Sequence, residues 1–192
     1  MNPFKKVEFQ INESFIKKVP NTVATLPFKN ETDNKDAPYI LRKSFYQQFS
    51  TKRFKDVELS DVDYILFINN LSDKNLNIED SKWLGKILKA DALIYGDIKR
   101  YRGVYLIIYS FIIMEVNLKM VDSQTGEILW EANHSTTSFA GDMPSITANA
   151  LMELIPTLIL GPFKAILNLR KIEYIHTADD LCKRIVDTIP YN

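Results

Sequence analysis

The stretch Leu118–Glu131, with the sequence LKMVDSQTGEILWE, decides the fold. Apolar side chains on both sides of a polar centre indicate two strands joined by a tight turn. Gly126 can adopt the positive φ that such a turn requires at little cost. The apolar run from Val104 leads into the first strand, so the sequence predicts a long antiparallel hairpin with strands of about 104–121 and 128–137. In the return strand, alternation places Trp130 on one face and Leu129 with Glu131 on the other.

Shorter elements precede this hairpin. Runs rich in β-branched and aromatic residues alternate with runs whose apolar side chains recur every three or four positions. These patterns predict strands at about 22–28, 56–59 and 90–98, helices at about 38–50, 60–70 and 78–89, and a turn at 101–103.

The chain after the hairpin has a helical pattern. The segment of about 145–169 is apolar, and its prolines predict that it is kinked or split into two helices. Thr177 with Asp180 resembles a capping box and predicts the start of a last helix, which Pro190 ends.

This order of elements predicts an α/β (mixed α+β) fold. Helical crossovers between the early strands imply parallel pairing, whereas the later hairpin is antiparallel. We expect a single domain over 21–192 with a mixed, mostly five-stranded sheet flanked by helices and with extra C-terminal helices within 145–189. Residues 1–20 are expected to form an N-terminal arm.

Composition narrows the function classes. The chain has 192 residues, 46% of them hydrophobic, and its 24 basic and 24 acidic residues give a net charge of zero, so no global basic field favours nucleic acid. No glycine-rich phosphate loop is present, and neither His134 nor His176 has a second ligand at metal spacing. Cys182 is the one cysteine and is expected to be buried. We predict no catalytic residue, no cofactor and no metal.

The most unusual segment is Leu154–Phe163, which contains no charge and a single polar side chain. One interpretation is a pair of buried helices. The other is an exposed apolar surface for self-association or membrane contact. We take four of its residues as a candidate interaction surface: Pro156, Leu158, Ile159 and Phe163.

Three stretches together resemble a known family. They are Val23–Asn30 (VATLPFKN), Ala90–Gly96 (ADALIYG) and Leu118–Glu131. Their order and spacing are similar to those of bacterial envelope lipoproteins typified by a neisserial vaccine-candidate antigen. That family in turn resembles a superfamily of CsgG-like, LpoB-like and TolB N-terminal-like domains. The resemblance covers about 20–140. The relatives' glycine-rich stretch after the hairpin is replaced here by Ser138–Pro144.

The resemblance implies a function as well as a fold. It implies a non-enzymatic protein on the periplasmic side of the outer membrane, acting as a binding, assembly or secretion-accessory module. Its partners would be envelope proteins or further copies of itself, with no nucleic acid. The family's anchor is a lipidated cysteine that follows a signal peptide, and neither is visible near Met1. We therefore expect that a leader has been removed ahead of Met1.

Two alternatives stay open. One is a ring-forming outer-membrane secretion subunit that resembles the curli channel and recruits the hairpin of about 104–137 to the membrane. The run 104–114 is almost continuously apolar, which favours a buried strand over the alternation of a lipid-facing one. The other alternative is an enzyme whose site the sequence does not reveal.

Overall fold

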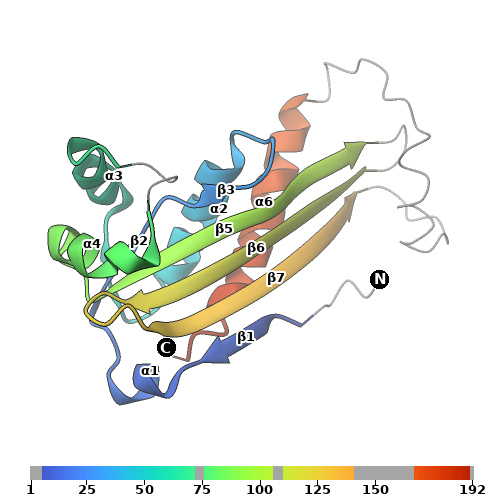
Figure 1. Cartoon of the computed structure of the whole chain (residues 1–192). Helices are drawn as coiled ribbons and strands as arrows, with labels where there is room; N and C mark the ends of the chain where they lie inside the picture. The colour runs from blue at the N-terminus through green and yellow to red at the C-terminus, as the bar shows by residue number, and fades with distance from the viewer. Residues whose placement is uncertain (1–5, 72–75, 106–109, 141–166, 191–192) are drawn as a thin grey trace.

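A seven-stranded mixed sheet forms the centre of the protein (Figure 1). The computed structural model describes residues 6–71, 76–105, 110–140 and 167–190. The strand order is β1-β7-β6-β5-β2-β4, and β3 pairs with β5 beside β2. The bounds are β1 Glu8–Ile11, β2 Thr22–Thr25, β3 Lys29–Asn30, β4 Lys55–Val57, β5 Ala92–Tyr105, β6 Ser110–Asp122 and β7 Ile128–Ala140.

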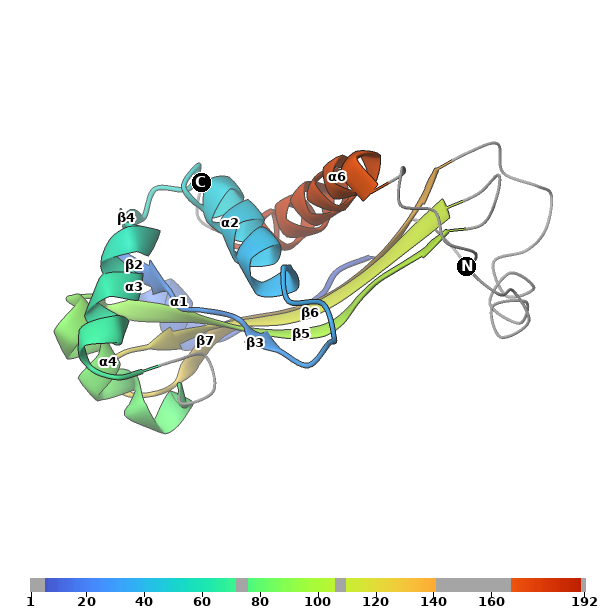
Figure 2. The same cartoon turned by 90° about the horizontal axis from the view of Figure 1, so that it is seen from above.

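Helices cover both faces of this sheet. Figure 2 shows α2 (Ala37–Phe49) and α6 (Leu167–Val186) side by side on one face. On the other face, α3 (Leu59–Ile68) and α4 (Ser81–Leu88) pack near β2. The remaining short helices are α1 (Glu13–Lys17) and the 3₁₀ turn η2 (Ile78–Asp80).

Alternation along the strands builds one core on each face. Val23 and Ile94 belong to the core beneath α2 and α6, whereas Ala24 and Leu93 belong to the core beneath α3 and α4. β2 pairs in parallel with both β4 and β5, and a strand covered on both faces must be apolar on both. The α/β class and the mixed pairing are therefore confirmed. The sheet has two strands more than expected, because β1 and β3 also pair.

The hairpin of β5 and β6 corrects one prediction. The expected turn at 101–103 is absent, since Tyr101 pairs with Met114 and Gly103 with Ile112 within the ladder. A bulge between Ile98 and Arg100 absorbs an extra residue without ending the strand. The apolar run that looked like one strand is consequently shared between β5 and β6.

The turn between β6 and β7 is the predicted one. Gly126 has φ +75°, and the Asp122 carboxylate accepts hydrogen bonds from the backbone N–H groups of Gln124 and Thr125 at 2.8 and 2.9 Å. A register shift follows at once, because Met120 pairs with Trp130 but Val121 with Ile128. Leu129 is therefore buried in the same core as Trp130, and its predicted place on the Glu131 face is wrong.

Helix α6 begins ten residues before the predicted start. Thr177 lies inside the helix, and the capping-box interpretation is wrong because no proline or glycine interrupts 167–186. The buried Trp130 of β7 donates its indole N–H to the Thr188 hydroxyl just beyond α6, at 3.0 Å. Cys182 is buried as predicted. None of the helices that the structure describes is both long and apolar enough to cross a bilayer.

Candidate binding groove between α2 and α3

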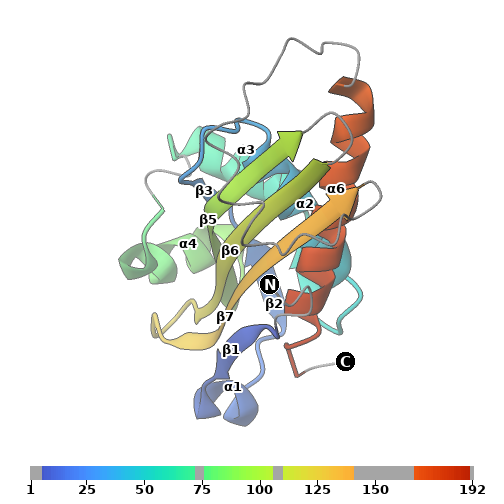
Figure 3. The ribbon, with the colours of Figure 1, turned by 90° about the vertical axis from the view of Figure 1, so that its right-hand side faces the viewer.

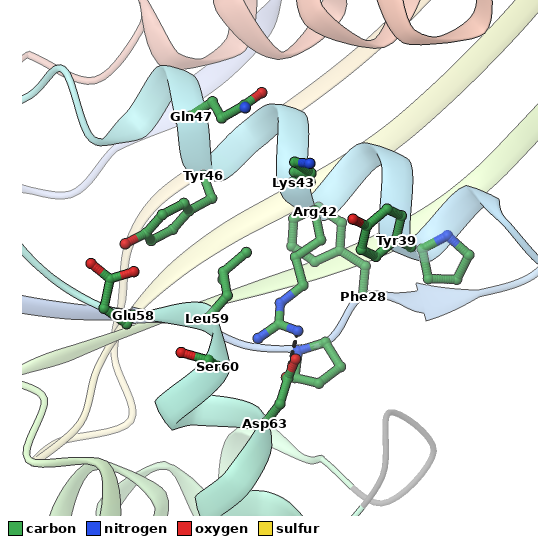
Figure 4. A pocket seen from close by; sticks show the side chains of 12 residues that line it. Phe28, Tyr39, Arg42, Lys43, Tyr46, Gln47, Glu58, Leu59, Ser60 and Asp63 are labelled. Carbon is green, nitrogen blue, oxygen red and sulfur yellow. Dashed lines mark hydrogen bonds and ion pairs between the residues drawn. The ribbon is translucent and has the colours of Figure 1, made fainter. Parts of the chain in front are cut away.

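An open groove of about 650 Å³ lies between α2 and α3 (Figure 4). This volume is within the roughly 300–1,000 Å³ of small-molecule sites. Apolar and aromatic side chains supply most of the surface of its walls, and charged and polar side chains also line it. The lining residues are Pro27, Phe28, Pro38, Tyr39, Arg42, Lys43, Tyr46, Gln47, Glu58, Leu59, Ser60 and Asp63.

Helical spacing explains how α2 forms one wall. Tyr39, Arg42 and Tyr46 recur every three or four residues, so they share a face of the helix. The other face of α2 carries Leu41 and Phe45 into the main core. The same helix thus anchors the fold on one side and presents tyrosines to the groove on the other.

Arg42 is the buried polar centre of this region. Its Nε and Nη2 donate to the Thr25 carbonyl at 3.2 and 2.8 Å, and its Nη1 meets Asp63 Oδ1 at 2.6 Å. Burial lowers the pKa of Arg42, and Asp63 acts in the opposite direction. A guanidinium stays protonated in proteins nonetheless. Arg42 therefore stays positively charged, and its contacts link β2, α2 and α3.

The far end of the groove is acidic. Figure 4 shows the Tyr46 hydroxyl directed toward the Glu58 carboxylate. Burial raises the pKa of Tyr46, and Glu58 and then Asp56 raise it further. Burial also raises the pKa of Asp56. These shifts favour neutral side chains and supply no activated nucleophile.

Metal-ligating side chains and the cysteine thiol are two kinds of group that bear on catalysis. The described residues contain no group of three His, Cys, Asp or Glu side chains placed to hold a metal ion. The Cys182 thiol lies in the core, and burial raises its pKa, which opposes formation of the reactive thiolate. The groove can receive apolar or aromatic groups.

The structure does not test the candidate surface predicted from the sequence. Pro156, Leu158, Ile159 and Phe163 fall outside the described residues. The groove itself was not predicted. A signal for it exists in α2, where Tyr39 and Tyr46 are seven residues apart on a face that also carries Arg42. The partner wall comes from a distant segment, which spacing along one helix cannot reveal.

A mixed sheet with helices on both faces and an aromatic groove defines an α/β domain suited to binding. Residues 12–174 match the family described as "Putative lipoprotein GNA1162-like", and the chain belongs to this family. The wider relationship to CsgG-like and TolB-like domains stays a prediction. A search of curated protein sequences gave no match.

Solved structures share this fold. Lipoprotein GNA1162 from Neisseria meningitidis has a TM-score of 0.55 at 19% identity, over 72% of this chain and 95% of that one. A PelC dodecamer from Paraburkholderia phytofirmans has a TM-score of 0.57 at 12% identity, over 95% of this chain and 96% of that one. A second crystal form of the PelC dodecamer gives 0.56 at 10% identity, over 94% of each chain. At such identities the likeness establishes the fold alone.

Proposed function

We propose that this protein is a lipid-anchored, non-enzymatic assembly module on the periplasmic side of the bacterial outer membrane. The observation that carries the proposal is membership of a lipoprotein family over most of the chain. The groove between α2 and α3 supports a binding role, because Phe28, Tyr39 and Tyr46 line it and offer aromatic surface to a partner.

The position of the lipid follows from the burial of the thiol. Cys182 is the one cysteine of this sequence and is 1% exposed within the core. An acyl chain on that sulfur would disrupt the packing of α6 against α2. We therefore propose that the lipid is carried by a cysteine outside these 192 residues.

The test is to express the native gene in a bacterial host, separate its membranes and measure the intact mass of the product. We expect a membrane-bound protein whose N-terminal cysteine carries a diacyl or triacyl group. The control is the same gene with that cysteine replaced by serine, which should leave the membrane fraction. An unmodified product outside the membrane fraction would contradict the proposal.

A second candidate function is that of a ring-forming subunit. It is favoured by the fold shared with PelC dodecamers over 95% of this chain. The described part of the hairpin carries charged pairs on its outward face, Arg100 with Glu115 at 3.3 Å and Lys119 with Glu131 at 3.4 Å. Charges are costly against lipid. We therefore propose that copies associate through faces outside the bilayer.

The mass of the purified protein tests this second candidate. A ring would give one discrete species of many times 22.2 kDa by native mass spectrometry. A monomer at every concentration would exclude it. On sequence grounds we also propose the surface of Pro156, Leu158, Ile159 and Phe163 as an interaction site, to be tested by replacing Leu158 and Phe163 with alanine.

A further inference from the structure

Helix α3 has large apolar side chains on its outer side as well as on its inner side. Val62 and Leu66 are buried against β2 and α4. Tyr64, Phe67 and Ile68 point the other way and are 65%, 77% and 55% exposed. Large apolar side chains exposed side by side on one helix mark an interaction surface, so this outer side is a face without its partner in the described chain. We call these three side chains the α3 face.

A second exposed apolar surface lies on α1 and β1. Ile16 of α1 is 72% exposed and Phe9 of β1 is 42% exposed. Figures 1 and 3 place α3 above α1 and β1, whereas Figure 2 shows α3 and α1 at the same end of the sheet, so the two surfaces are separated in one direction only. We call Phe9 and Ile16 the α1 edge.

The charges near the two surfaces are complementary. Residues 58–68 contain Glu58, Asp61 and Asp63 and no basic residue, and Arg42 of α2 already pairs with Asp63, so Glu58 and Asp61 supply the acidic character. Residues 6–18 contain three lysines and two glutamates, and Lys17 and Lys18 directly follow Ile16. Lys17 pairs with Glu13 at 3.4 Å, so Lys18 is the basic residue next to Ile16 on which the attraction mainly rests. An anionic lipid surface would repel the acids around the α3 face, whereas the α1 edge of another copy would attract them.

We infer that the α3 face of one copy docks on the α1 edge of the next copy, in a head-to-tail contact. This inference rests on the proposed ring-forming function and names the surfaces that would build the ring. Because the two surfaces are different and lie apart, each copy can engage two neighbours. Repetition of such a contact closes into a ring or continues as a filament.

The size of the α3 face fits the centre of such a contact. Its exposed area comes to roughly 400 Å², taking roughly 200 Å² for each complete large side chain. A specific interface buries about 800 Å² on each partner. The α3 face would thus supply about half, with the polar residues around it as the rim, which is the usual arrangement.

Two single substitutions test the contact. Phe67→Ser removes the most exposed side chain of the α3 face, and Ile16→Ser removes the centre of the α1 edge. Each is expected to weaken association roughly 30-fold, the effect of losing a central anchor residue. The matched control is Ile175→Ser on α6, a position that is 39% exposed and belongs to neither surface. Far-UV circular dichroism verifies that each variant is folded.

An equimolar mixture of the two variants distinguishes head-to-tail from symmetric contact. The Ile16→Ser chain keeps its α3 face, and the Phe67→Ser chain keeps its α1 edge, so one good contact can form between them. Native mass spectrometry of the mixture should show a heterodimer as the largest species. If α3 faces instead met each other, Ile16→Ser alone would assemble like the unaltered chain.

The outcomes separate the inference from the proposed function. A monomeric unaltered protein overturns ring formation as a whole. An unaltered protein that assembles together with two variants that assemble equally well overturns the α3–α1 contact and leaves ring formation standing. Loss of assembly in Phe67→Ser but not in Ile16→Ser overturns the head-to-tail geometry.

Discussion

Replacing Arg42 with methionine is expected to lower the free energy of unfolding by about 2–4 kcal/mol. The guanidinium gives two hydrogen bonds to the Thr25 carbonyl, at 3.2 and 2.8 Å, and is itself buried. A hydrogen bond from a charged donor contributes about 1.5–3 kcal/mol, and a buried carbonyl left without a donor costs about 1–3 kcal/mol. Methionine keeps the apolar stem of the side chain. The loss of stability in Arg42→Met therefore measures the polar contacts of the guanidinium.

The contact with Asp63 contributes less to this loss. The Asp63 side chain is 54% exposed, and exposed ion pairs contribute about 0–1 kcal/mol. Asp63→Asn also keeps an oxygen that can accept from Arg42. We expect Asp63→Asn to cost less than about 1 kcal/mol. The surface control Lys43→Met, on the same helix, is expected to stay within about 0.5 kcal/mol of the unaltered protein.

Equilibrium unfolding in urea, followed by far-UV circular dichroism and by tryptophan fluorescence, measures all three variants. The two signals must coincide before a two-state analysis is applied. We expect Arg42→Met to lower the free energy of unfolding much more than Asp63→Asn does. Asp63→Asn and Lys43→Met should have similar, small effects. If Arg42→Met costs no more than Asp63→Asn, the hydrogen bonds to Thr25 do not hold β2 to the helices and the reasoning is wrong.

Three further substitutions test packing and charge by the same unfolding measurement. Gly96→Ala should cost about 1–3 kcal/mol by overpacking, because a Cβ there would meet the Phe28 ring at 2.6 Å; an unchanged midpoint would mean that the ring moves aside freely. Trp130→Phe should lower the free energy of unfolding by about 1–3 kcal/mol, because it loses the hydrogen bond to Thr188 and leaves a cavity. The control Trp83→Phe, at the surface, should lower it by less than about 0.5 kcal/mol. Burial raises the pKa of Asp56 in the folded protein, so stability is lost as the pH rises from the ordinary carboxyl pKa of 3.8 through the raised pKa and the side chain ionises. Asp56→Asn should therefore be more stable than the unaltered protein at pH 7 and equal to it below pH 3.8. An equal difference at both pH values would contradict that assignment.

Local patterns predicted the hairpin of β6 and β7 because its determinants are adjacent in the sequence. Asp122 and Gly126 fix the turn through contacts within five residues. The turn before β6 was misplaced because Tyr101–Gly103 contains residues typical of turns, yet pairing with β6 keeps these residues extended. Leu129 was assigned to the wrong face for a related reason. A bulge depends on the partner strand, and strict alternation along one strand cannot show it.

The groove and the α3 face were missed because they depend on how helices lie relative to the sheet. The α3 sequence predicts a helix with Val62 and Leu66 inside, and both residues are buried. Nothing in its pattern distinguishes Phe67 from a further core residue, because large apolar side chains occur on the outer side of the helix as well as on its inner side. Only the position of α3 at the side of the sheet leaves that outer face uncovered.

Arg42 connects stability with assembly in this arrangement. Its ion pair ends on Asp63, which precedes Phe67 by one helical turn, so the groove and the α3 face share the same helix. A rigid hold on α3 keeps the three exposed side chains in one orientation, and a preorganised surface loses less entropy on docking. The cation that ties β2 to two helices thus also positions the surface that we assign to the next copy.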